Sequence, residues 1–126
     1  MLESHEECLA YLEKIRWNGT PICPYCGSNR ATKYKSEHRY RCNDCFTSYS
    51  VTVGTLFHRT HVDLSKWFRA IELLCKLDRD ISIRKLALEL KVNRATATVM
   101  VDRVLGAPAE HADLLREIVR IFEKLN

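Results

Sequence analysis

Hydrophobic residues recur with a helical period at the start of the chain. From Cys8 to Trp17 the apolar side chains keep spacings of three and four, which indicates one buried helix face. Ser4 followed by Glu7 is a capping-box pair, and the turn sequence Asn18–Pro21 is a stop signal. The pattern therefore predicts a first helix that ends at about Trp17.

Between Ile22 and His58 the pattern changes to short strand-like runs separated by turn residues. The runs are Thr32–Lys35, His38–Arg41 and Thr47–Val53, and Gly54 closes this part. Runs of this length predict a small antiparallel sheet.

Helical periodicity returns after residue 62. Asp63 or Ser65 can begin a helix over "SKWFRAIELLCKL", whose apolar stripe is Trp67, Ile71, Leu74 and Cys75. A short helix "SIRKLALEL", a tight turn "KVN" and a helix "RATATVMVDRVL" follow. The stop "GAP" then precedes an amphipathic helix over residues 110–125.

Four cysteines stand in two pairs, Cys23-x2-Cys26 and Cys42-x2-Cys45, with fifteen residues between the pairs. This is the spacing of a zinc ribbon, in which two tight turns joined by a β-hairpin close a tetrahedral cage. The alternative is a disulfide or a redox pair. Because about 35 residues bury too little apolar surface to fold unaided, we favour one structural Zn²⁺.

The remaining cysteines and the histidines are not expected to bind metal. Cys8 and Cys75 lie on apolar helix faces, so we predict that both are buried thiols. With four thiolates available, His38, His58 and His61 receive no metal role.

Together these elements predict a small α+β chain: an N-terminal helix, a four-cysteine zinc ribbon of three short antiparallel strands, an all-α helix-turn-helix bundle and a C-terminal helix. The predicted division is 1–62 for the first helix and the ribbon, 63–106 for the helix-turn-helix and 107–126 for the last helix.

Composition and charge narrow the class of partner. The chain has 126 residues, 46% of them hydrophobic, and no apolar run long enough to span a membrane. Its acidic N-terminus is unlike a signal peptide, so we expect a cytoplasmic, nucleoid-associated protein. The net charge is +4, and residues 23–62 carry six basic and two acidic side chains. This bias favours a polyanion as partner.

Two regions are candidates for contact with nucleic acid. In the ribbon hairpin, basic residues alternate with aromatic ones, a pattern suited to a phosphate backbone and to stacking on bases; the alternative is a solvated strand face. The basic residues concerned are Lys33, Lys35, Arg39 and Arg41.

Residues 82–105 have the pattern of a helix-turn-helix. Leu86, Ala87, Leu90, Val92, Ala97, Met100 or Val101, and Val104 are expected to face inward. The predicted DNA contacts are Asn93, Arg94, Ala95, Thr98 and Arg103. Lys91 stands where such turns most often have glycine, and a plain bundle of helices is the alternative.

The order of these segments resembles the N-terminal region of zinc-ribbon insertion-sequence transposases. The similarity runs from about Glu7 to Leu105 through "CLAYLEKIRWNG", "CPYCGS", "YRCNDCFTSYSVTVGTLF", "LSKWFRAIELL" and "ISIRKLALELKVNRATA". The resemblance implies a terminal-repeat binding module in which Cys23, Cys26, Cys42 and Cys45 hold zinc and the helix from Asn93 reads DNA.

In that family a DDE-type nuclease domain follows, with three carboxylates that bind two Mg²⁺ ions. Here the late acids Glu110, Asp113, Glu117 and Glu123 share one predicted helix, so we expect no enzymatic activity from this chain. The expected function is zinc-dependent, sequence-selective binding of double-stranded DNA, by a domesticated transcription regulator or a truncated transposase.

Two alternatives remain at this point: a protein-interaction adaptor, and the DNA-targeting subunit of a split transposase or nuclease with catalysis in trans. The heptad-like seam Leu114, Ile118, Ile121 and Leu125 either docks on the bundle or forms a homodimer through 110–125.

Overall fold

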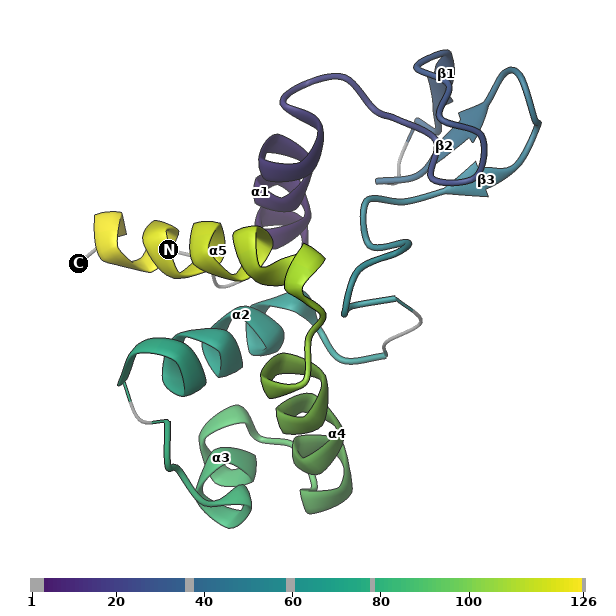
Figure 1. The fold of residues 1–126 in the computed structure, drawn as a ribbon. Helices are drawn as coiled ribbons and strands as arrows, with labels where there is room; N and C mark the ends of the chain where they lie inside the picture. The colour runs from purple at the N-terminus through teal and green to yellow at the C-terminus, as the bar shows by residue number, and fades with distance from the viewer. Residues whose placement is uncertain (1–3, 36–37, 59–60, 78, 126) are drawn as a thin grey trace.

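The computed structural model describes residues 4–35, 38–58, 61–77 and 79–125. It shows a small α+β protein, as the sequence predicts. Helix α1 (His5–Trp17) connects a three-stranded zinc ribbon to a group of helices, and the ribbon and the α3–α4 pair lie at opposite ends of the molecule (Figure 1).

The boundaries of α1 follow its capping residues. The Ser4 hydroxyl oxygen accepts a hydrogen bond from the Glu7 N–H at 3.1 Å. At the other end Asn18 adopts left-handed angles (φ 48°), and its N–H donates to the Lys14 carbonyl at 3.1 Å. Asparagine tolerates this conformation better than most residues, so "NGT" ends the helix where the sequence predicts.

The sheet consists of β1 (Ala31–Lys33), β2 (Tyr40–Cys42) and β3 (Ser48–Tyr49), antiparallel and in that order. Each strand is shorter than the run predicted for it. The third run stops at Tyr49 because the chain then turns: the Val53 N–H donates to Ser50 O and the Thr55 N–H to Thr52 O.

The helical part begins with α2 (Leu64–Glu72), which passes directly into a π-helical turn (Leu73–Leu77). It continues through α3 (Ile83–Leu90), α4 (Arg94–Leu105), a 3₁₀ turn (Ala109–His111) and α5 (Ala112–Leu125). Within the described part of the chain, no helix is both long and apolar enough to cross a membrane.

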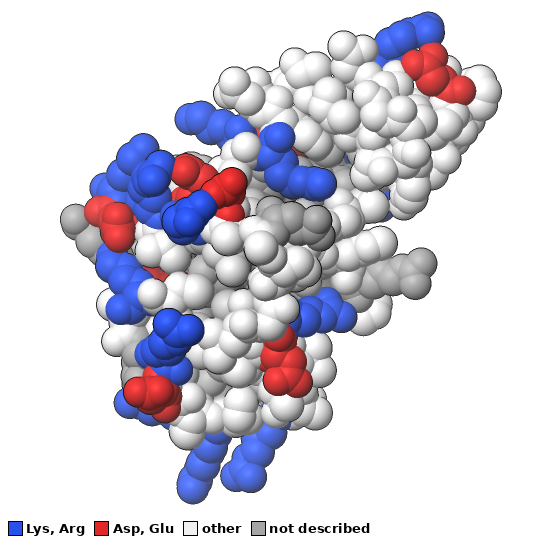
Figure 2. All heavy atoms as spheres, in the orientation of Figure 1, with Lys and Arg blue, Asp and Glu red and all other residues white. Residues whose placement is uncertain are grey.

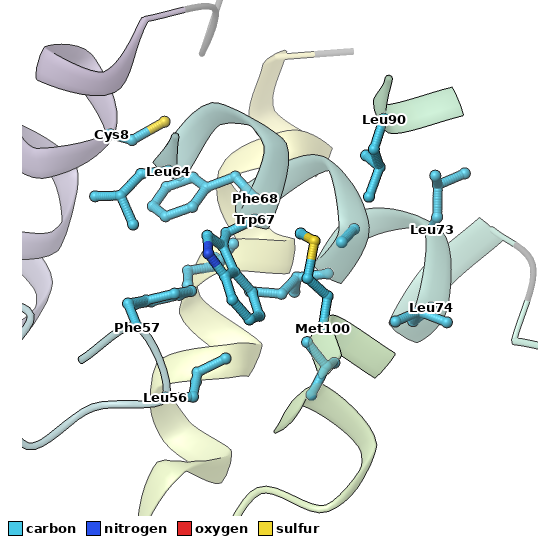
Figure 3. Close-up of a cluster of buried hydrophobic side chains, with 14 of the residues drawn as sticks. Cys8, Leu56, Phe57, Leu64, Trp67, Phe68, Leu73, Leu74, Leu90 and Met100 are labelled. Carbon is cyan, nitrogen blue, oxygen red and sulfur yellow. The ribbon is translucent and has the colours of Figure 1, made fainter. Parts of the chain in front are cut away.

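One large core unites these helices with α1. Trp67 and Phe68 of α2 lie at its centre against Phe57, with Met100 of α4 and Cys8 of α1 at its sides (Figure 3). The ribbon has a separate small cluster: Cys23, Tyr40, Cys42 and Tyr49. Whether the three predicted segments behave as separate units stays a prediction, but α1 shares its core with the helices.

The two cysteines outside the ribbon differ. Cys8 is fully buried, as predicted, and burial followed by the charge of Glu7 raises the pKa of its thiol to about 12. Cys75 is exposed, which contradicts the prediction of a buried thiol. The π-helical turn explains the error, because its i→i+5 hydrogen bonds shift residues 73–77 out of the α-helical phase.

Helix α5 packs back on α1 and α2. Leu114 and Ile118 are buried in the large core and Ile121 packs against it, whereas the side chain of Leu125 lies outside the described residues. The seam therefore has the docking role in this chain. Dimerisation through 110–125 stays a prediction, and it would need other side chains.

Candidate zinc centre and nucleic-acid interface

The four ribbon cysteines meet at one point. Their Sγ atoms all lie within 4.8 Å of one another. Cys23 Sγ is 3.7 Å from Cys45 Sγ, and Cys26 Sγ is 3.5 Å from Cys42 Sγ. Four sulfurs at about 2.3 Å from a tetrahedral Zn²⁺ are about 3.8 Å apart, whereas a disulfide requires about 2.05 Å. The site therefore fits a metal ion and excludes a disulfide between these pairs.

The two pairs sit on backbone turns of the same shape. In the first, the Gly27 N–H donates to Cys23 O at 2.9 Å; in the second, the Phe46 N–H donates to Cys42 O at 3.0 Å. One backbone N–H in each turn also approaches a sulfur at 3.4 Å, from Tyr25 to Cys23 and from Cys45 to Cys42. Such N–H groups favour thiolates.

The pKa values of Cys42 and Cys45 also favour the thiolate form. The Cys45 N–H lowers the pKa of the Cys42 thiol to about 6, and the hydroxyl and N–H of Thr47 lower the pKa of Cys45. At Cys26 the backbone N–H of Ser28 also lowers the pKa, but the sulfur of Cys42 and burial outweigh it and raise the value to about 12. A divalent cation removes this competition because it stabilises all four thiolates.

The ribbon holds one structural Zn²⁺. Four thiolates complete the tetrahedral set and leave no position for a reactive water, so the ion supplies folding energy and no chemistry. The ligands are those predicted from the spacing: Cys23, Cys26, Cys42 and Cys45.

Helix α1 attaches the ribbon to the core. The Trp17 ring meets Tyr40 edge-on at 5.4 Å and Tyr49 at 5.8 Å. The Tyr40 hydroxyl donates to Glu13 Oε1 at 2.9 Å; burial and this bond raise the pKa of Tyr40 to about 12. The Arg16 guanidinium, whose pKa burial lowers, donates to the carbonyls of Val51 at 2.7 Å and Val53 at 2.9 Å.

The sheet register divides the predicted basic residues of the ribbon. Arg41 lies opposite Thr32 and Ser48, whereas Lys33 lies opposite Tyr40 and hence on the other face. Arg39 shares the face of Arg41 by alternation along the chain. Lys35 follows the end of β1 and is exposed. The pattern of alternating residues was visible in the sequence, but the pairing that assigns each residue to a face was not.

We call the side of the sheet that carries Arg41 the outer face. It also carries two exposed aromatic rings, Tyr34 of the predicted aromatic and basic hairpin and Phe46, which the sequence analysis did not single out. The Tyr34 hydroxyl is 2.8 Å from Ser48 Oγ, and the Arg41 guanidinium lies 5.1 Å from the centre of the Phe46 ring. Its members are Thr32, Tyr34, Arg39, Arg41, Phe46 and Ser48.

At the other end of the molecule, α3 and α4 are joined by a tight turn. Lys91 has left-handed angles (φ 57°, ψ 46°), and the Val92 N–H donates to Ala87 O at 3.0 Å. This is a Schellman motif, in which glycine is the usual residue at the Lys91 position. Asn93 then caps α4, because its Oδ1 accepts from the Thr96 N–H at 2.7 Å.

Helix α4 buries one face and exposes the other. Ala97, Met100 and Val104 are buried against the core. The predicted DNA contacts of this segment are all exposed: Asn93, Arg94, Ala95, Thr98 and Arg103. Lys and Arg side chains project from the lower end of the molecule, where α3 and α4 lie (Figure 2).

Two details of α4 go beyond the sequence prediction. The Arg103 guanidinium donates to Leu56 O at 3.3 Å and His58 O at 3.4 Å, so it contacts the neighbouring loop. Val99 was not predicted as a contact, yet it is 47% exposed and lies one helical turn beyond Ala95 on the outward face. A helical projection of the sequence places it opposite the buried stripe and could have found it.

Comparison with known proteins gives two similarities. Residues 3–48 match the family described as "Transposase zinc-ribbon domain". A protein from Halobacterium salinarum, named "Uncharacterized protein in transposable element ISH50", is 34% identical over 119 residues, which cover 90% of this chain. The matched region is 40% of that relative's length. No solved structure matches the chain.

Proposed function

We propose that the chain is a zinc-dependent, sequence-selective module that binds double-stranded DNA, because residues 3–48 match the transposase zinc-ribbon family. The observation that carries this proposal is the arrangement of α3, the Lys91 turn and α4. It leaves the first turns of α4 exposed with Arg94, Ala95 and Thr98 outward.

The exposed side of α4 has the chemistry to read a major groove. Arg94 in its first turn can donate two hydrogen bonds to the O6 and N7 atoms of guanine. The side chains of Ala95 and Val99 offer apolar contact to a thymine methyl group. The Asn93 amide and the N–H groups at the start of α4 can donate to a phosphate, which would fix the depth of the helix in the groove.

Arg103 has a different role in this proposal. Because its guanidinium contacts the carbonyls of Leu56 and His58, it holds the loop beside the end of α4. It would position the reading helix, and it would contact phosphates only at the edge of the groove.

The chain spans 40% of the length of the relative that it matches. We therefore propose a targeting role for this chain, with any strand-transfer chemistry carried by another part or another subunit of a transposase. A freestanding regulator of transcription would use the same surfaces. Localisation to the cytoplasm and nucleoid is part of this proposal.

Selection of bound sequences from a random duplex pool, with zinc-loaded protein, tests the function. An enriched motif would support sequence-selective binding. If the protein binds no duplex even at low salt, the proposal fails and the adaptor reading gains support.

Once a motif is known, Arg94→Ala should weaken binding to it about tenfold or more and weaken binding to random DNA much less. Arg116→Ala is a matched control, because Arg116 is an exposed arginine on α5 that pairs with Asp113. Equal loss on both DNAs for Arg94→Ala would contradict the assignment of α4 as the reading helix.

A further inference from the structure

Phe46 has a backbone conformation that its side chain disfavours. Its φ is 64°, in the left-handed region. The equivalent residue of the first cysteine turn is Gly27, with φ 79°. The turn around each cysteine pair imposes this angle, and glycine adopts it without strain. An aromatic residue here needs a compensating reason.

Packing among the residues that the structure describes does not provide that reason. Phe46 is 65% exposed, and it lies outside both clusters of buried side chains. Among the described residues, the ring contact found for Phe46 is with the guanidinium of Arg41, 5.1 Å from the ring centre. A large apolar ring that is both strained and open to solvent suggests a ligand that covers it.

The surroundings of Phe46 indicate the chemistry of that ligand. Arg41 lies directly across from Ser48 in the sheet, and Ser48 Oγ is 2.8 Å from the Tyr34 hydroxyl, so Phe46, Arg41 and Tyr34 belong to one continuous face. Among the described residues, neither Arg39 nor Arg41 has a carboxylate partner. The outer face therefore combines exposed aromatic rings with the positive charges of Arg39 and Arg41.

This combination fits the bases of a nucleic acid strand. Phosphate contact alone needs only the arginines, whereas aromatic rings and guanidinium planes stack on nucleobases that have left the duplex. A paired base presents only its edge, so the rings could not reach the flat surface of a base inside a double helix. We propose that the outer face of the ribbon binds unpaired nucleobases by stacking on Phe46. This inference rests on the proposed function, and it adds a second binding site for single-stranded DNA.

The proposal predicts a preference among DNA ends. The probes are a blunt duplex, the same duplex with a single-stranded thymidine extension, and the same duplex with an abasic extension of equal length. The abasic extension keeps every phosphate and lacks every base. The protein should bind the thymidine extension about tenfold more tightly than the abasic one, since stacking is worth this much per base. Equal affinity for the two extensions would overturn the proposal.

Substitutions at Phe46 separate the ligand role from a structural one. Phe46→Asn should abolish the preference for the thymidine extension while zinc content is unchanged and the melting temperature does not fall, because asparagine tolerates left-handed angles. Phe46→Trp should keep the preference. Retention of the preference in Phe46→Asn would contradict the assignment.

Tyr25 provides a matched control. It is 56% exposed in the first cysteine turn and does not have positive φ. Tyr25→Asn should leave the preference intact, and an equal loss there would overturn the assignment to the outer face. The two proposals can fail separately. If the protein binds the blunt duplex and the extension has no effect, only this inference is lost. If it binds thymidine strands and no duplex, only the proposed function is lost.

Discussion

Lys91 is the residue at which the turn between α3 and α4 is least favourable. Its left-handed angles cost about 1–2 kcal/mol for a residue with a Cβ atom. We expect Lys91→Gly to raise the free energy of unfolding by about 0.5–1 kcal/mol, after allowance for the greater flexibility of glycine in the unfolded chain. Urea unfolding of zinc-loaded protein measures the change. Lys91→Ala keeps the Cβ atom and should give no such gain; an equal gain from alanine would show that strain is not the cause.

Val99 allows a test of base reading with a single methyl group. If its side chain contacts a thymine of the selected site, replacing that thymine by uracil should weaken binding about fourfold, because one methyl group no longer becomes buried. Val99→Ala should bind the thymine and uracil sites with nearly equal affinity. Fluorescence anisotropy on the two duplexes measures both effects. A full thymine preference in Val99→Ala would assign the contact to another residue.

At the scale of elements, the sheet register places the basic residues of the ribbon on two opposite faces. Arg39 and Lys33 are both exposed, but they lie on opposite faces of the hairpin. If the outer face follows the DNA backbone, Arg39→Ala should reduce the slope of log K against log salt by about 1, and Lys33→Ala should leave it unchanged. Titrations at several salt concentrations test this. The reverse result would place DNA on the other face.

The sequence predicts those elements whose local signals agree with their packing. Ser4 and Asn93 cap helices as expected, and the spacing of Cys23 to Cys45 specifies the metal site because a tetrahedral thiolate cage has few solutions. Features that depend on tertiary context were missed. The π-helical turn exposes Cys75, and the strand pairing separates Lys33 from Arg41.

The backbone strain at Phe46 could have been predicted from the sequence, but the exposure of its side chain could not. Alignment of the two cysteine pairs puts Phe46 in the place of Gly27, which predicts strain at that position. Its exposure, however, depends on how the ribbon docks on α1, and no local pattern reports that. Sequence reasoning therefore located the zinc site, and the structure was needed to identify the outer face.

At the scale of the whole molecule, α1 joins two small folds by packing against both of them. Cys8 and Leu12 belong to the large core, whereas Trp17 at its end packs on the aromatic rings of the ribbon. Arg16 fixes the segment that leaves the sheet through the carbonyls of Val51 and Val53. The outer face and α4 are thereby held at opposite ends (Figure 1). Two linked DNA contacts would favour sites in which both are present at once.

Removal of zinc should unfold the ribbon and leave the helical part of the chain folded. Structural zinc contributes about 10–16 kcal/mol of binding energy to small domains that have little core of their own. Among its described residues the ribbon has four buried side chains in its cluster, so a chelator should unfold it. The segment from Val51 should stay folded, because Val51, Leu56 and Phe57 are buried in the large core.

Thiol labelling measures which cysteines become accessible, and therefore which part of the chain unfolds. In the zinc-loaded protein Cys75 should react first because it is exposed, although partial burial raises the pKa of its thiol, whereas Cys8 is buried and its pKa is raised to about 12. After chelation the four ligands should react as well, while Cys8 remains protected and most of the helical circular dichroism persists. If Cys8 becomes reactive together with the ligands, zinc supports the whole fold and the large core cannot stand without the ribbon. If α4 still selects its DNA site after chelation, the ribbon contributes affinity and the helices carry the specificity.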